Sequence, residues 1–383
     1  MLPIDSAEAR LVGRVWRPDV GGPSVILVRG GDVIDVTATY PTVTDLLEAD
    51  AAAMFDGLAG EAIGKVTDFI QDPDDNGALD RPHLLAPCDL QALKACGVTF
   101  ARSMVERVID EKTAGDPARA DAIRRRIGEL LGDSLSALKA GSEAAEEVKA
   151  ILIREALWSQ YLEVGIGRDA EVFTKSQPMS AVGYGAYVGV HPVSKWNNPE
   201  PEVVLAVDSR GGIKGATLGN DVNLRDVEGR SALLLGKAKD NNASCAIGPF
   251  IRLFDDHFTL ADVECATLTM RVVGPEGFEM TGRSNMAEIS RSPADLVGQT
   301  IGRHHQYPDG LMLFLGTMFA PTQDRGAIGN GFTHHAGDTV EISSPRLGTL
   351  RNVVTATDVA RPWKFGSRAL MQNLAARGLL GAA

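Results

Sequence analysis

The composition of the chain is that of an acidic, folded protein. Its 383 residues include 44% hydrophobic and 23% charged side chains, and the formal net charge is −12. This hydrophobic content is too high for an intrinsically disordered chain, and the length predicts two domains or one large domain with an insertion. An acidic chain without a block of Lys and Arg is a poor polyanion binder, so we expect no nucleic acid or membrane partner.

Several features predict a cytoplasmic protein. Residues 1–16 lack a basic start followed by an apolar run, so we expect no signal peptide, and no apolar stretch reaches membrane-spanning length. The four cysteines show no CxxC spacing. We therefore expect buried thiols in a reducing compartment.

Alternating apolar residues and turn residues predict a β-rich start to the chain. Residues 11–40 contain three short runs rich in β-branched residues, with turns at 19–23 and 30–32, and we expect three strands there. Residues 45–70 carry a weaker helical pattern, with Thr44 as the expected cap.

The turn-rich segment 71–82 marks the first expected domain boundary. It separates a small N-terminal domain over residues 1–80 from a catalytic domain over residues 81–383. Beyond Phe100, apolar residues recur at helical spacing and predict a helical insertion over about residues 107–165.

Strand signals dominate the second half of the chain. Between Val172 and Val354, apolar runs are separated by Gly and Pro turns, and residues 367–383 predict a short helix. Together these elements predict an α+β fold that is mainly β.

The pattern Glu200-Pro201-Glu202 opens an apolar run that reads as a strand. Residues i and i+2 of a strand share a face, so both carboxylates point the same way. Two like charges on one face repel unless a cation or protons intervene, and Mg²⁺ prefers such hard oxygen ligands. Taken alone, the pair is more often part of a solvated edge strand.

Further polar residues follow this strand. Asp221 comes after a Gly-rich turn and could supply a third carboxylate, and Lys239 lies nine residues before Gly248. A lysine beside a divalent cation has its pKa depressed by like charge and desolvation, which makes it a possible base. Each of these segments alone is more often a solvated turn.

Taken in order, these motifs resemble the fumarylacetoacetate hydrolase superfamily. Gly316-Thr317 follows an apolar strand, and the segments 337–342 and 347–354 resemble the family's closing motifs. The resemblance covers residues 80–106 and 170–355, and it implies a mixed β-roll catalytic domain.

The resemblance implies a set of site residues and an assembly. Glu200, Glu202 and Asp221 match the family's ligands for Mg²⁺ or Mn²⁺. Lys239 matches its active-site lysine, and Thr317 matches a hydroxyl near the substrate. Arg225 and Lys175 match basic positions near the substrate less closely. The superfamily is usually dimeric, which implies a homo-oligomer, a dimer or a dimer of dimers.

One departure from the family pattern bears on the reaction type. The family's carbon–carbon hydrolases carry a His–Glu pair that activates water, and this chain has Ser103 at the His position while it keeps Glu106. A lone serine is not a general base at neutral pH. The substitution argues against hydrolysis of a carbon–carbon bond.

The segment around Ser103 resembles the dehydratase branch that acts on 2-keto-3-deoxy-D-xylonate or its L-arabonate isomer. The resemblance implies a metal-dependent loss of water from a 2-keto acid substrate that yields 2,5-dioxopentanoate in pentose catabolism. In this hypothesis Lys239 removes a C3 proton, Glu106 protonates the leaving C4 hydroxyl, and Ser103 belongs to the same catalytic set.

Two rival interpretations stay open. One is a hydrolase of acylpyruvate-like acids or a decarboxylase of oxaloacetate-like acids on the same metal site, which Ser103 disfavours. The other is a protein without enzymatic activity whose carboxylates hold a structural cation. Lys239 and Thr317 argue against it, since a structural ion site has no use for a lysine at its edge.

Overall fold

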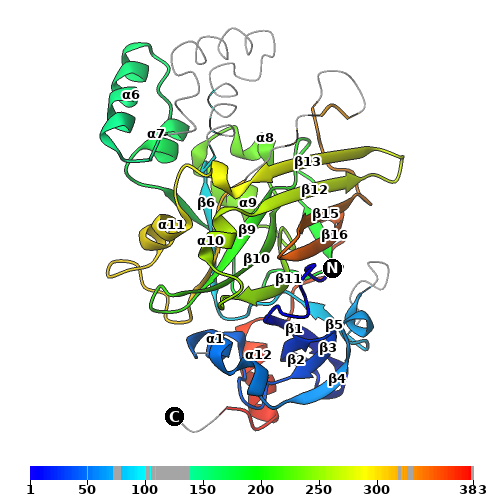
Figure 1. Cartoon of the computed structure of the whole chain (residues 1–383). Helices are drawn as coiled ribbons and strands as arrows, with labels where there is room; N and C mark the ends of the chain where they lie inside the picture. The colour runs from blue at the N-terminus through cyan, green and yellow to red at the C-terminus, as the bar shows by residue number, and fades with distance from the viewer. Residues whose placement is uncertain are drawn as a thin grey trace.

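Two β-sheets form the framework of the protein (Figure 1). The computed structural model describes residues 1–49, 51–71, 79–100, 104, 108, 138–317, 321, 323–325 and 331–380. The larger sheet has eleven strands in the order β4-β3-β2-β1-β11-β10-β9-β14-β6-β7, with β5 paired to β1. Its strands are β1 (Leu11–Arg17), β2 (Gly22–Arg29), β3 (Asp32–Asp35), β4 (Glu61–Lys65), β5 (His83–Leu85), β6 (Ala92–Gly97), β7 (Glu171–Ser176), β9 (Pro201–Val207), β10 (Ile213–Asp221), β11 (Cys245–Leu253) and β14 (Leu311–Phe314).

The smaller sheet has five strands in the order β13-β12-β15-β16-β8. These are β13 (Glu279–Asn285), β12 (Thr267–Val273), β15 (Thr339–Ser344), β16 (Gly348–Ala356) and β8 (Tyr187–Val190). The two sheets confirm the predicted fold, which is mainly β and mixed, because β16 pairs with β8 in parallel while its other neighbour is antiparallel.

Short helices surround the sheets. They are α1 (Val43–Glu48), α2 (Ala51–Met54), α6 (Glu143–Arg154), α7 (Gln160–Ile166), α8 (Arg225–Glu228), α9 (Leu235–Lys239), α10 (Leu260–Glu264), α11 (Pro293–Thr300) and α12 (Ser367–Ala376). Within the part of the chain that the structure describes, no helix is long and apolar enough to cross a membrane.

The N-terminal segment agrees with the sequence pattern in its strands and departs from it afterwards. β1, β2 and β3 with their two turns confirm the three strands expected within residues 11–40. The helical pattern expected over residues 45–70 is confirmed only in its first part, where α1 and α2 lie, and is wrong beyond Met54. α1 is capped by Thr42, whose hydroxyl accepts the Asp45 N–H, and β4 follows after a Gly-rich stretch that cannot sustain a helix.

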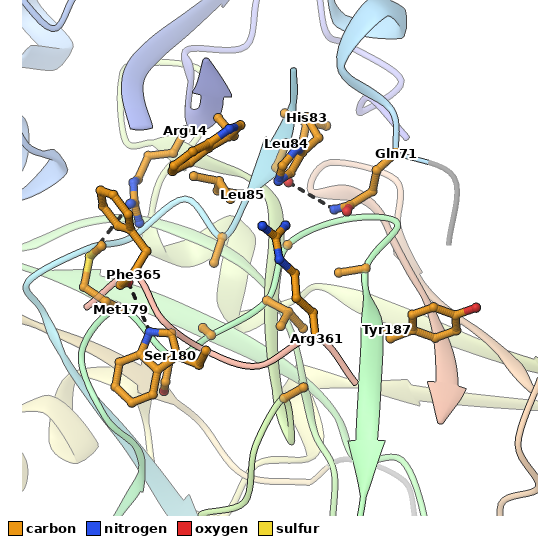
Figure 2. A pocket seen from close by; sticks show the side chains of 18 of the residues that line it. Arg14, Gln71, His83, Leu84, Leu85, Met179, Ser180, Tyr187, Arg361 and Phe365 are labelled. Carbon is orange, nitrogen blue, oxygen red and sulfur yellow. Dashed lines mark hydrogen bonds between the residues drawn. The ribbon is translucent and has the colours of Figure 1, made fainter. Parts of the chain in front are cut away.

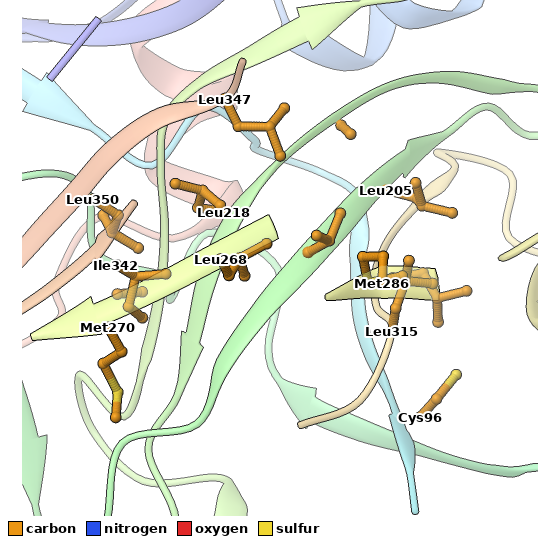
Figure 3. Close-up of a cluster of buried hydrophobic side chains, with 14 of the residues drawn as sticks. Cys96, Leu205, Leu218, Leu268, Met270, Met286, Leu315, Ile342, Leu347 and Leu350 are labelled. Atoms are coloured by element: carbon orange, nitrogen blue, oxygen red, sulfur yellow. The ribbon is translucent and has the colours of Figure 1, made fainter. Parts of the chain in front are cut away.

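The main core lies between the two sheets. Apolar residues of β9 and β10, such as Leu205 and Leu218, pack against Leu268 of β12, Ile342 of β15 and Leu350 of β16 (Figure 3). Alternate residues of the same strand, Val204 and Ala206, face a second cluster on the other side of the sheet. The strands that carry the carboxylates are therefore buried on both faces and held rigidly.

The expected domain division at residue 80 stays a prediction. The strands on both sides of it belong to one hydrogen-bonded sheet, because β1 pairs with β11 as well as with β2. In Figure 1 the C-terminal helix α12, in red, lies beside the blue N-terminal strands, and Asn373 of that helix donates a 2.8 Å hydrogen bond to the carbonyl of Val20. α12 confirms the predicted C-terminal helix.

Two further expectations meet the structure only in part. Of the helical insertion expected over residues 107–165, α6 and α7 are described, and residues 109–137 lie outside the described residues. Cys88, Cys96 and Cys245 are buried as expected, whereas Cys265 is exposed just after α10, which corrects that expectation for one of the four thiols.

Candidate metal centre

The ends of three neighbouring central strands of the large sheet lie side by side and bring the acidic residues together. β9 is antiparallel to both of its neighbours, so its first residues lie beside the last residues of β10 and β14. In this register Glu202 lies directly opposite Gly219, two residues before Asp221. Glu200 precedes β9, and its carbonyl accepts a 3.0 Å hydrogen bond from the Asp221 N–H.

Glu200, Glu202 and Asp221 form a compact buried triad. Each offers a carboxylate oxygen within 4.8 Å of the others, and none of the three is more than 3% exposed. Burial raises the pKa of Glu202 well above its ordinary value, and the charges of Asp221 and Glu200 raise it further. Such a set needs a cation or a proton to be stable, and three hard oxygen ligands fit a divalent cation of the Mg²⁺ type.

Lys239 lies against this triad. Its ammonium, at the end of α9, donates to Oε2 of Glu200 and to Oδ2 of Asp221, the latter at 3.0 Å. Burial alone would lower the pKa of Lys239, but the charges of Asp221 and Glu200 outweigh it, and the pKa lies above its ordinary value. The depressed pKa expected for a base is therefore not present without a cation to offset these carboxylates.

Lys175 lies deeper than expected. Its side chain is fully buried, and its ammonium lies 2.9 Å from Oδ1 of Asp221 and 3.2 Å from the carbonyl oxygen of Val222. The Lys239 carbonyl and the Ser244 hydroxyl complete its surroundings. Lys175 thus supports a carboxylate of the triad with a fully buried side chain, and its expected position near a substrate stays a prediction.

The segment after β14 orients Glu202. The Gly316 N–H donates to Oε2 of Glu202 at 2.7 Å, and the Thr317 hydroxyl donates to Oε1 at 3.2 Å. Gly316 has a φ of 100°, and a Cβ there would lie 2.0 Å from the Thr99 hydroxyl oxygen, so glycine is required. The expected neighbourhood of Thr317 and the triad is present in the structure.

Sequence reasoning missed the residues that hold Glu200. Asn223 donates to Oε1 of Glu200 at 3.0 Å and to Oε2 of Glu228 at 2.6 Å, and Asn220 accepts the Glu200 N–H. The signal was available, because Asn223 lies two residues after Asp221 in the same polar motif. Phe173 was also missed; the Lys239 ammonium lies 5.7 Å from its ring centre.

The remaining expected site residues divide into two groups. Arg225 begins α8, and its guanidinium stacks 4.1 Å from the ring centre of Trp196. Its contact with substrate stays a prediction. Ser103 and Glu106 lie outside the described residues.

Comparisons with known proteins identify similar sequences. A family model described as "Fumarylacetoacetate (FAA) hydrolase C-terminal" matches residues 172–355. A protein of Haloferax volcanii named "Probable 2-keto-3-deoxyxylonate dehydratase" is 30% identical over 262 residues, which cover 67% of this chain and 85% of the relative. The "2-dehydro-3-deoxy-D-arabinonate dehydratase" of Saccharolobus solfataricus is 29% identical over 222 residues, covering 58% of this chain and 70% of the relative.

Solved structures share the fold. A 2-keto-3-deoxy-D-arabinonate dehydratase complexed with magnesium and 2,5-dioxopentanoate superposes with a TM-score of 0.61 at 20% identity, covering 90% of this chain and 99% of that chain. A fumarylacetoacetate hydrolase from Exiguobacterium antarcticum superposes with a TM-score of 0.52 at 17% identity, covering 91% and 100% of the two chains. At these identities the likeness establishes the architecture.

Proposed function

The chain belongs to the fumarylacetoacetate hydrolase family, and from this premise we propose that it is a divalent-metal-dependent dehydratase that converts a 2-keto-3-deoxy-pentonate into 2,5-dioxopentanoate. The observation that carries the proposal is the buried triad of Glu200, Glu202 and Asp221 with the Lys239 ammonium against two of its members. The relatives at 30% and 29% identity are both named as dehydratases of such acids.

We propose the D configuration for the substrate. In these acids C2 is a carbonyl and C3 a methylene, so C4 is the only stereocentre. The acids derived from D-xylonate and D-arabinonate are therefore one compound, and the acid derived from L-arabonate is its enantiomer. The relative named for the D-arabinonate derivative supports the D form.

The triad would hold the metal ion, Mg²⁺ or Mn²⁺, through one oxygen of each carboxylate. When bound, such an ion supplies Lewis-acid chemistry that acidifies the C3 protons next to a chelated 2-keto acid. Gly316 and Thr317 keep the Glu202 carboxylate oriented, and Asn223 does the same for Glu200. Lys175 neutralises the outer oxygen of Asp221.

Lys239 would move the proton at C3. Its Nζ is buried beside the triad and 5.7 Å from the Phe173 ring centre, which keeps bulk water away from it. It is held charged by the carboxylates of Glu200 and Asp221, so it can act as a base only when positive charge offsets them. The role therefore requires a loaded site.

Glu106 would protonate the leaving hydroxyl at C4, and Ser103 and Arg225 would contact the hydroxylated end of the substrate. Loss of the C3 proton and of the C4 hydroxyl removes one water and leaves a C3–C4 double bond. A proton then leaves C5 and another is added at C3, which gives the C4–C5 enol. Tautomerisation of this enol yields the C5 aldehyde, so atoms balance without any external nucleophile.

We also propose that this reaction serves pentose catabolism in the cytoplasm and that the enzyme is a homo-oligomer, a dimer or a dimer of dimers. Light scattering of the purified protein gives the particle mass directly. A monomeric mass at micromolar concentration would contradict the proposed homo-oligomer and would leave the proposed dehydratase reaction unaffected.

Activity against the two enantiomers tests the reaction. Purified enzyme with Mg²⁺ should form aldehyde from the D acid, and chelation should abolish the rate. Turnover of acylpyruvate or oxaloacetate with no turnover of either pentonate would favour the rival hydrolase or decarboxylase reading. Binding of Mg²⁺ without any of these activities would favour a structural cation site.

Hydrogen exchange in deuterated water tests the roles of the two proton handlers. Lys239→Ala should lose dehydration and the exchange of the C3 hydrogens, with Lys237→Ala on the exposed side of α9 as the matched control. Glu106→Gln should lose dehydration by about 10²- to 10⁴-fold but retain some C3 exchange, because enolisation precedes departure of the hydroxyl. The opposite pattern in the NMR spectra would reverse the two assignments.

A further inference from the structure

A second cavity lies away from the metal centre, between the N-terminal strands and the segment that leads into α12. It has a volume of about 270 Å³ and is walled by residues of β1, β5, the segment 179–187 and the segment 361–365 (Figure 2). Among the described residues that line it, none is a carboxylate of the acidic triad or one of the residues named above that bond to the triad. The cavity is therefore a separate compartment whose lining can be considered on its own.

The charge of this cavity is opposite to that of the protein. Its basic lining residues are Arg14, His83, Arg361 and Lys364, and no aspartate or glutamate is among the described residues that line it. The whole chain carries 50 acidic and 38 basic residues. A cation-lined cavity in an acidic protein favours an anion over a neutral or cationic occupant.

Arg361 is the first of two arginines in this cavity whose guanidinium group has no carboxylate partner among the described residues. Figure 2 shows its side chain extending into the cavity toward His83 and Leu84. Among the residues that the structure describes, it has no hydrogen-bond or ion-pair partner. Burial lowers the pKa of Arg361, and no neighbouring acid offsets this effect. An arginine remains charged under such conditions, so its desolvation is uncompensated.

Arg14 is the second. It is only 4% exposed, and it donates to the carbonyl of Cys88 and, at 3.8 Å, to the sulfur of Met179. Its described contacts include no carboxylate. A buried guanidinium is usually paired with an acid, whereas the described acceptors of Arg14 are neutral, so a bound anion could pair with its charge.

The walls between the two cations are flat and apolar. The Trp16 ring stacks on His83 at 6.4 Å between centres, and Phe365 meets Trp16 edge-on at 5.2 Å. Burial, with a smaller effect of Arg361, lowers the pKa of His83, and its Nδ1–H donates to the Arg81 carbonyl at 3.0 Å. The neutral His83 ring therefore offers a flat surface for packing and carries no charge. Leu84, Leu85 and Val182 also line this apolar part of the cavity.

We propose that this cavity binds a small organic carboxylate with a flat apolar body. The carboxylate would pair with Arg361, whose planar fork matches two carboxylate oxygens, and Arg14 would add positive charge from the opposite wall. The body would lie against Trp16, His83 and Phe365. The site is independent of the metal centre and of the proposed dehydration.

Tryptophan fluorescence can report binding directly, because Trp16 and Trp363 line the cavity. Benzoate is the probe, added to metal-free protein. It should give a saturable change, and its neutral isostere benzamide should bind at least about tenfold more weakly, since it lacks the charge that pairs with Arg361. No saturable change up to about 10 mM benzoate would overturn the proposal, as would equal binding of benzamide.

Variants separate this cavity from other anion sites. Arg361→Met should weaken benzoate binding at least about tenfold, whereas Arg303→Met, which changes an exposed arginine elsewhere, should leave it unchanged. Glu202→Gln should also leave it unchanged, because the metal centre takes no part. If Arg361→Met has no effect while its circular dichroism is native, the assignment is wrong. If inorganic phosphate binds as tightly as benzoate, the apolar walls are not recognised and the proposed ligand class is wrong.

Discussion

Replacing Glu202 by glutamine should separate the stability of the metal-free protein from its response to Mg²⁺. Glutamine keeps the shape of the side chain. Its carbonyl oxygen can accept the Gly316 N–H, and its amide can donate to the Thr317 hydroxyl oxygen, so both contacts of the native carboxylate are preserved. What the substitution removes is one of the three charges in the triad.

The expected magnitude follows from the spacing of the carboxylates. Their oxygens lie within 4.8 Å of one another, and two unit charges at that distance repel by about 3.5 kcal/mol at an effective dielectric of about 20. Burial and this repulsion raise the pKa of Glu202, which favours its protonated form in the metal-free protein. The substitution should therefore change the metal-free free energy of unfolding by less than about 1 kcal/mol.

In the presence of Mg²⁺, the wild-type protein and the Glu202→Gln variant should differ clearly in unfolding free energy. At a concentration of 100 times the dissociation constant, the ion stabilises the wild-type protein by about 2.7 kcal/mol, and the variant, which has lost one of three anionic ligands, should gain little. Urea unfolding with Mg²⁺ and with a chelator measures both differences, and Glu288→Gln, which changes an exposed residue of a short 3-10 helix, is the matched control. Equal stabilisation of both proteins by Mg²⁺, or a loss of more than about 2 kcal/mol in the chelated variant, would refute the reasoning.

Three further predictions concern other parts of the molecule. Burial would raise the pKa of Asp338, but hydrogen bonds from His334 and Arg325 outweigh it and lower the pKa to about 2. The Asp338 carboxylate therefore stabilises the fold at pH values above 3.8, its pKa in the unfolded chain. The difference in unfolding free energy between wild type and Asp338→Asn should shrink by about 2 kcal/mol as the pH falls from 5 to 2. Acid-dependent urea unfolding checks it, and a constant difference would contradict it. Gly219→Ala should cost about 1 to 3 kcal/mol of unfolding free energy, because a Cβ there would lie 2.3 Å from Cε1 of Phe314; an unchanged urea midpoint would show that the strands can separate at no cost. Ser103→His should not by itself produce acylpyruvate cleavage, since a general base needs an orienting partner and a positioned water; loss of acylpyruvate absorbance with this single variant would show that one residue sets the reaction type.

The triad was predictable from sequence because it depends on local rules. Glu202 is the second residue of β9 and Glu200 lies just before the strand, so the extended chain places both carboxylates on the same side. Asp221 ends the next strand, and antiparallel pairing of neighbouring strands brings it to the same edge. Spacing indicated that the carboxylates could meet, but taken alone it favoured solvated residues, and the resemblance to the family was needed to predict a metal site.

Other parts of the site depend on contacts that spacing cannot reveal. The donor that orients Glu202 is the main-chain N–H of Gly316, 114 residues away, and any residue except proline offers an N–H. The ion pair between Lys175 of β7 and Asp221 joins residues 46 positions apart, and spacing gave no sign of it. The helical pattern expected over residues 45–70 stops at Met54, and glycines at 57, 60 and 64 disfavour a helix in the stretch that follows.

The attachment of Glu202 to a main-chain amide has an evolutionary consequence. A hydrogen bond from the Gly316 backbone does not depend on the chemistry of the neighbouring side chains, so the orientation of the Glu202 carboxylate can persist when those side chains change. The residues proposed to choose the reaction, Ser103 and Glu106, come instead from a separate segment before the helical insertion. New chemistry could then arise by substitution in that segment while the carboxylates stay in place. A fold shared by a dehydratase and a hydrolase is what such a division between a backbone-anchored carboxylate and an exchangeable catalytic segment would produce.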